Sequence, residues 1–111
     1  MNKVSVMCNF KCRADKALPM EALLADMVEA AHEEPGVEIY SFHRGEENDF
    51  WFFALLRDRD VLMRHNTSDA TQAFLPEFAR LVESPPQIFV TTPVAAIGLD
   101  LDLAEETPFS I

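Results

Sequence analysis

Seven consecutive apolar residues, Phe50 to Leu56, constrain the fold of this chain more than any other feature. A strand with one face in water alternates apolar and polar side chains, so an unbroken apolar run predicts a strand that is buried on both faces. Successive side chains of a strand point to opposite sides of the sheet, which places Trp51, Phe53 and Leu55 together on one side. Each side of this strand therefore needs a cover.

The patterns on either side of this run predict the remaining elements. Strands are predicted over 4–13, 37–44 and 87–92, and helical spacing of apolar residues predicts helices over 18–33 and 58–83. The resulting order is strand, helix, strand, strand, helix, strand. This is the ferredoxin-like βαββαβ order, an α+β sandwich in which the helices cover one face of an antiparallel sheet.

Small polar residues and proline predict where the second helical region begins and breaks. Asp58 is a good N-cap for its first segment, and Thr67 or Ser68 caps a second segment. Pro76 should kink or divide that second segment, because proline removes a helical hydrogen bond. After the fourth strand, residues 94–99 are predicted to form a short fifth strand.

The second face of the aromatic strand predicts a dimer. Leaving Trp51, Phe53 and Leu55 in water would forgo about 1.5–3 kcal/mol for each side chain and would expose an adhesive patch. Two sheets packed face to face about a two-fold axis would bury that patch, giving a dimeric α+β barrel. A C-terminal tail folded over the sheet is the alternative, but the tail has few large apolar residues. We therefore expect a homodimer with a folded domain over 1–99 and an acidic tail over 100–111.

Composition argues against several kinds of partner and site. The net charge of −10 disfavours nucleic acid and anionic membranes, because neither attracts an acidic protein. No stretch approaches the roughly 20 apolar residues of a membrane span, and the first residues lack the apolar run of a signal peptide. Cys8 and Cys12 would lie roughly 13 Å apart on one strand, too far for a disulfide. We expect reduced thiols, no metal site and a cytoplasmic location.

Four short segments, in this order along the chain, match a known family: Glu34-Pro35-Gly36, the aromatic strand running into Arg57-Asp58, His65-Asn66-Thr67, and Ser84-Pro85-Pro86. Over about 4–99 the chain resembles the antibiotic biosynthesis monooxygenase family of small dimeric α+β-barrel proteins. The resemblance implies a pocket between the sheet and its helices for a small aromatic or quinol-like molecule. Several members oxidise such molecules with O2, so the resemblance implies a monooxygenase that uses no metal, flavin or other cofactor.

His65 and Asn9 are the candidate catalytic residues. His65 matches the histidine of the family, and an imidazole can remove a phenolic proton near neutral pH. The resulting phenolate could pass an electron to O2. The alternative for His65 is a hydrogen bond at a helix end. Asn9 lies among apolar neighbours and needs partners, which could be a substrate carbonyl, an oxygen intermediate or a neighbouring loop.

Six further residues are candidates for the wall of a substrate pocket. Trp51 could stack on a flat substrate or belong to the core of the dimer. Tyr40 and Phe42 share one face of a strand, where they line either the pocket or the core. The full set of candidate substrate-binding residues is Trp51, Tyr40, Phe42, Phe52, Leu62 and Phe74.

Several positions depart from the residues that the family usually carries. Members that oxidise polyketides have an Asn-x-x-x-Trp pattern where this chain has Phe52 and Leu56, and their tyrosine falls near Leu62. A common glutamate falls on Ala54, and a second histidine falls on Ala70. The alternatives to an oxygenase are therefore a non-catalytic small-molecule-binding or structural dimer, or an isomerase or lyase on the same scaffold.

Overall fold

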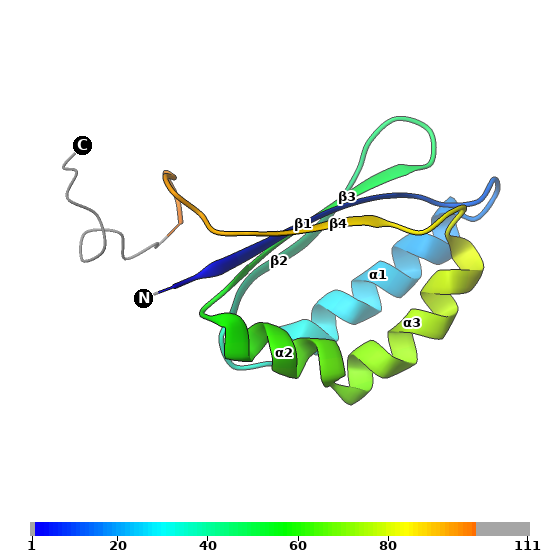
Figure 1. Ribbon diagram of the computed structural model, residues 1–111. Coiled ribbons are helices and arrows are strands. Elements are labelled where there is room, and N and C mark those ends of the chain that lie inside the picture. Colours follow the sequence, from blue (N-terminus) through cyan, green and yellow to red (C-terminus); the bar gives the residue numbers. More distant parts are fainter. Residues whose placement is uncertain (1, 100–111) are drawn as a thin grey trace.

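The computed structural model describes residues 2–99, which form a single four-stranded antiparallel sheet with three helices. The sheet order is β2-β3-β1-β4, and Figure 1 shows the helices in one layer on one side of the sheet. This is the predicted ferredoxin-like α+β architecture. In chain order the elements are β1 (Val4–Lys11), α1 (Ala17–His32), β2 (Val37–Arg44), β3 (Asp49–Leu56), α2 (Arg59–Thr67), α3 (Asp69–Leu81) and β4 (Gln87–Thr91).

The pairing of the two central strands decides which side chains face the helices. Phe10 of β1 lies opposite Phe50 of β3, and Val6 lies opposite Ala54; all four are buried. Because side chains alternate along a strand, the even-numbered residues of both strands point toward the helices and the odd-numbered residues point toward the open face. The aromatic strand β3 therefore supplies large side chains to both faces, as predicted.

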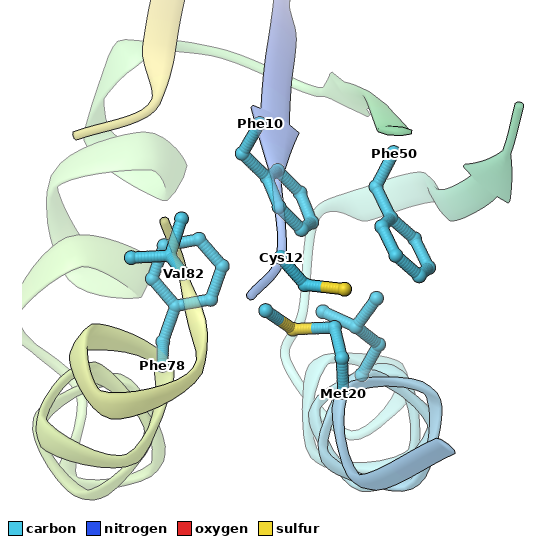
Figure 2. Packing of buried hydrophobic residues seen from close by; sticks show 7 residues of the cluster. Phe10, Cys12, Met20, Phe50, Phe78 and Val82 are labelled. Carbon is cyan, nitrogen blue, oxygen red and sulfur yellow. The ribbon is translucent and has the colours of Figure 1, made fainter. Parts of the chain in front are cut away.

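A cluster of buried rings and aliphatic side chains fixes the helices on the sheet. The ring of Phe10 stacks on Phe50 at a centroid distance of 5.4 Å and meets Phe78 of α3 edge-on at 4.9 Å. Figure 2 shows these rings with Met20 of α1 and Val82, which follows α3, in the space between sheet and helices. Each such side chain contributes roughly 1.5–3 kcal/mol on burial, so this cluster links both long helices to the centre of the sheet.

A second cluster anchors the short helix α2 at the other end of the sheet. It joins Val61 of α2 to apolar side chains of the two central strands, namely Val4, Val6, Ala54 and Leu56. The side chain of Asp58 caps α2 by accepting a hydrogen bond from the Val61 backbone N–H at 2.9 Å. The predicted N-cap is confirmed, and it holds Val61 at the start of α2 against the sheet.

The break in the second helical region falls where Ser68 caps α3. The Ser68 hydroxyl accepts a hydrogen bond from the Thr71 backbone N–H at 3.1 Å. Pro76 lies inside α3 and does not divide it, so that part of the prediction is wrong. Both Pro76 and Gln72 are exposed, so water can pair with the Gln72 carbonyl that proline leaves without a helical donor.

The predicted fifth strand over 94–99 is also wrong. The described chain beyond β4 has no ladder partner, and Figure 1 shows it running away from the sheet. Pro93 has no N–H to offer a neighbouring strand, and the side chains of Val94 and Ile97 are exposed. The acidic tail over 100–111 lies outside the described residues.

Gly36 lets the turn between α1 and β2 pack closely against α2. Its φ is +90°, and a Cβ at this position would overlap Cγ2 of Val61. The Gly36 carbonyl also accepts a hydrogen bond from the Arg57 backbone N–H at 2.9 Å, which ties the turn to the chain entering α2. Gly98 has the same φ of +90°, but apart from its chain neighbours no atom of residues 2–99 lies within 4 Å of a Cβ built there.

We expect Gly36→Ala to destabilise the fold by about 3 kcal/mol, combining about 1–3 kcal/mol of backbone strain with about 1–3 kcal/mol of overpacking against Val61. Gly98→Ala carries the same backbone change without the overlap, and we expect about 1 kcal/mol, the lower end of the backbone term. Urea unfolding of both variants at one protein concentration checks this. Equal losses for the two variants would show that the approach to Val61 contributes nothing.

Candidate active site

An apolar cavity of about 190 Å³ lies between the sheet and the helices. Its lining comes from the helix-facing side of the strands and from all three helices. Apolar cavities of about 150 Å³ can take up a benzene ring, so this one has room for a small substituted aromatic molecule. Five of the six residues predicted to form a pocket wall are part of its lining: Tyr40, Phe42, Phe52, Leu62 and Phe74.

A second hollow, of about 260 Å³, lies between α1 and the edge strand β2. Its charged groups are Arg44 and Glu21, which pair with each other at 2.7 Å and are both exposed. Such an exposed ion pair is well solvated, and each charged group already has a partner of opposite charge. The mainly apolar cavity, where His65 and Tyr40 meet, is therefore the better candidate for an active site.

A chain of three polar side chains enters the apolar cavity. Nε2 of His65 lies 3.2 Å from Oη of Tyr40, and both residues line the cavity. On the other side of the ring, Nδ1 of His65 lies 2.8 Å from Oε1 of Glu34. His65 is only 9% exposed, so water has little access to the ring. The result is a row of hydrogen-bonded groups, carboxylate, imidazole and phenol, that ends inside the cavity.

The three hydrogen-bonded side chains come from different parts of the fold. Glu34 lies in the turn after α1, Tyr40 lies on β2, and His65 lies in the last turn of α2. The break between α2 and α3 holds His65 in place, because its carbonyl accepts hydrogen bonds from the hydroxyls of Ser68 at 3.0 Å and Thr71 at 2.6 Å. The interruption of the helix thus positions the imidazole.

The environment of Tyr40 keeps its hydroxyl protonated. Burial raises the pKa of Tyr40 well above its usual value, and the nearby charge of Glu34 and the Cys8 thiol raise it further. The ring meets Phe52 edge-on at 4.8 Å and Phe42 at 5.7 Å, which fixes its direction. A neutral tyrosine hydroxyl in this place can donate a hydrogen bond to an imidazole nitrogen.

The structure places Asn9 and Trp51 on the opposite face of the sheet from His65. The two residues lie opposite each other on the central strands, at odd-numbered positions that face away from the helices. The Asn9 amide donates to Oδ1 of Asp49 at 3.1 Å and to the Phe50 carbonyl at 3.0 Å. The ring of Trp51 is 52% exposed. Neither residue lines the cavity that His65 and Tyr40 share.

Glu34 is the functional candidate that the sequence analysis missed. It is 31 residues from His65, a separation that matches no periodicity of helix or strand. In the sequence it reads as part of the turn that closes the first helix. The one available hint was that Glu34-Pro35-Gly36 and His65-Asn66-Thr67 both carry the family resemblance, which suggested that the two segments belong to one site.

Other kinds of site find little support in the described part of the chain. Among residues 2–99, no three His, Cys, Asp or Glu side chains gather closely enough to hold a metal ion. Cys8 and Cys12 are both free thiols, as expected. Within the same residues, none of the helices has the length and apolar character that a membrane span requires.

Comparison with known proteins bears on both family and fold. The sequence profile of antibiotic biosynthesis monooxygenases matches residues 3–83. An uncharacterized protein from Synechocystis is 32% identical over 82 residues, which is 72% of this chain. The chain spans little more than half of that relative, 56% of its length.

Solved structures show the same fold. The Mycobacterium tuberculosis protein Rv0793 superposes with a TM-score of 0.79 at 23% identity, covering 85% of this chain and 97% of its own. A Nitrosomonas europaea protein of unknown function gives 0.79 at 20% identity, covering 90% and 97%. A structure described as an antibiotic biosynthesis monooxygenase gives 0.76 at 16% identity, covering 83% and 99%. At these identities the likeness concerns the fold alone.

The raised pKa of Tyr40 makes stability depend on alkaline pH. Unfolded tyrosine ionises near pH 10, whereas folded Tyr40 does not, so above about pH 10 the unfolded state binds fewer protons and stability falls. Tyr40 is the sole tyrosine of the chain, so ultraviolet absorbance of tyrosinate reports this residue alone. We expect no tyrosinate in the folded protein at pH 10, and a fall in stability above that pH which Tyr40→Phe reduces. An ordinary titration in the folded state would contradict the buried hydroxyl.

Proposed function

The chain belongs to the antibiotic biosynthesis monooxygenase family, and on that premise we propose that it oxidises a small phenol or quinol with O2 without a metal or flavin. The supporting observation is the meeting of an imidazole and a phenolic hydroxyl, 3.2 Å apart, in a cavity with a mainly apolar lining. The Tyr40 hydroxyl occupies this position at Nε2 of His65. In the proposal, a substrate phenol displaces it and makes the same contact with Nε2.

In the proposed reaction, Nε2 of His65 is the general base. It removes the phenolic proton, and the electron-rich phenolate passes one electron to O2. The substrate radical and superoxide combine at a ring carbon, and loss of water then leaves a quinone. The substrate gives up four electrons in total, one oxygen atom enters the product, and the other leaves as water. No external reductant is needed.

The cavity lining limits the substrate to a neutral molecule. No Lys, Arg, Asp or Glu side chain is among the described residues that line it. A carboxylate or sulfate on the substrate would therefore be buried without a charged partner, which is costly. Tyr40, Phe42, Phe52, Leu62 and Phe74 provide the apolar and aromatic walls. The proposal gives no chemical step to Asn9 or Trp51, because the sheet lies between them and His65.

We expect His65→Ala to lower turnover by about 10²–10⁴-fold, the usual contribution of a general base. Oxygen consumption with a panel of neutral phenols and quinols, followed in an oxygen electrode, measures it. His43→Ala is the matched control, because His43 is an exposed histidine on β2 that does not line the cavity. Unchanged turnover in His65→Ala would remove His65 from the mechanism.

A non-catalytic small-molecule-binding dimer is the second candidate function. It is supported by Phe52, Ala54 and Leu56, which stand where members of the family carry asparagine, glutamate and tryptophan. Quenching of protein fluorescence by the same compounds separates the two. Wild-type protein that binds a quinol but consumes no O2 would favour the binding function over the oxygenase.

We also propose that the open face of the sheet is buried between two copies of the chain, as is typical of the family. Met7 is 46% exposed, its β4 neighbour Phe89 is 58% exposed and Trp51 is 52% exposed, all on this face. Leu55, opposite Ser5 and Ile39, is already buried within one chain, so the expectation that it needs a partner is wrong. The remaining apolar patch still favours association.

We expect Met7→Lys to weaken the dimer, because it places a charge in the centre of the proposed interface. Met63→Lys is the matched control, since Met63 is also an exposed methionine but lies on α2, in the helical layer. Sedimentation velocity over a range of micromolar concentrations compares the two variants with the wild type. A monomeric wild type, or equal effects of both substitutions, would contradict the proposed interface.

A further inference from the structure

Glu34 is partly buried, and the packing of the fold does not explain the environment of its carboxylate. Its Oε1 contacts Nδ1 of His65 at 2.8 Å, and its Oε2 is buried without a hydrogen-bond partner among residues 2–99. Burying an unpaired carboxylate oxygen costs free energy, which suggests a role other than stability. We propose that Glu34 is a positioning residue that holds the proton of neutral His65 on Nδ1 and so leaves Nε2 as the base toward the cavity.

The direction of the hydrogen bonds carries this inference. An ionised carboxylate only accepts hydrogen bonds, so Nδ1 of His65 must be the donor to Glu34. A neutral imidazole has one N–H, and Nε2 therefore carries the free lone pair. The Tyr40 hydroxyl, which burial keeps protonated, donates to that lone pair at 3.2 Å. The hydrogen bonds then run in one direction, from Tyr40 through His65 to Oε1 of Glu34.

The same contact would stabilise the product of proton transfer. When Nε2 takes a proton, the ring becomes an imidazolium cation whose Nδ1–H already points at the Glu34 carboxylate. Charge-assisted hydrogen bonds of this kind are about twice as strong as neutral ones. Since His65 is almost completely buried, water cannot provide this stabilisation. Glu34 therefore acts on the substrate only through His65.

The turn that carries Glu34 is fixed against the helix that carries His65. The Glu34 backbone N–H donates to the Ala31 carbonyl at 3.0 Å, which continues the end of α1. Two residues later, Gly36 packs on Val61 of α2. These contacts set the carboxylate relative to α2, so the 2.8 Å approach to Nδ1 does not depend on a free loop.

The opposite arrangement of protons is the competing state. If Glu34 were protonated, it would donate to Nδ1, and the proton of neutral His65 would lie on Nε2. His65 would then donate to Tyr40 and could not remove a proton from a substrate. The two states differ at both ring nitrogens, so nitrogen spectroscopy distinguishes them without any substrate.

Long-range 1H–15N correlation spectra of 15N-labelled protein at about pH 8, where histidine is ordinarily neutral, test the assignment. His65→Ala identifies the His65 signals among those of the three histidines. We expect a protonated Nδ1 and an unprotonated Nε2 in the wild type. Glu34→Gln, whose amide can either accept or donate, is expected to give a mixture of both tautomers. Glu33→Gln removes the same charge from an exposed neighbour and should change nothing.

A proton on Nε2 in the wild type, or an unchanged tautomer in Glu34→Gln, would overturn the assignment.

The catalytic part of the inference rests on the proposed oxygenase and has its own readout. There we expect Glu34→Gln to lower kcat by about 10–100-fold with a small change in KM, and Glu34→Asp to restore part of it. The expected tautomers without O2 consumption would reject the oxygenase and keep the positioning role. Turnover that Glu34→Gln leaves unchanged would reject the catalytic part of the positioning role and keep the oxygenase.

Discussion

The antiparallel pairing of β1 with β3 is the constraint on which the rest of the structure depends. These two strands form the centre of the sheet, and their register places Phe10 opposite Phe50 and Val6 opposite Ala54. Because side chains alternate, a slip of one residue would exchange the two faces of a strand. Such a slip would turn Trp51 toward the helices and move Phe50 out of the core. Both the cavity and the open face therefore follow from one register.

The cavity lies where the two buried clusters meet. Phe42 and Phe74 pack against the cluster around Phe10, whereas Tyr40, Phe52 and Leu62 pack against the cluster around Val61, and all five line the cavity. They are only partly buried, so the helical layer does not fill the space above them. A rigid core on each side thus frames a gap that is apolar by composition. In such surroundings the hydrogen bonds that join Glu34, His65 and Tyr40 are stronger than in water, because little water competes for these groups.

Local patterns were enough to predict most of the fold. The apolar run of β3, the helical spacing in α1 and the side-chain cap at Asp58 are short-range features, and the structure confirms each. The failures at Pro76 and at 94–99 have a common reason. Whether a proline is tolerated or a strand pairs depends on solvent and neighbours, and the sequence of the segment does not contain that information.

The candidate site was less predictable, because it depends on which face a residue occupies and on contacts between distant segments. Asn9 is separated from Val6 and Phe10 by an odd number of residues, so alternation along a strand places it on the opposite face. With the β1–β3 register, that face is the open face of the sheet. The register itself comes from long-range pairing. Glu34 and His65 meet only because the turn after α1 packs against α2, a contact that no spacing rule anticipates.

Glu34 has different consequences for the stability of the fold and for the proposed activity. A buried carboxylate repays its desolvation only when its lone pairs are satisfied, and Oε2 of Glu34 has no hydrogen-bond partner among residues 2–99. Apolar residues of similar size at Glu34 and His65 would remove that cost, and the surrounding clusters would still hold the helices on the sheet. The carboxylate is therefore better explained by the orientation of an imidazole than by the stability of the fold. Apolar residues of β3 contribute to the cavity wall, and in the proposed reaction Glu34 and His65 supply its base.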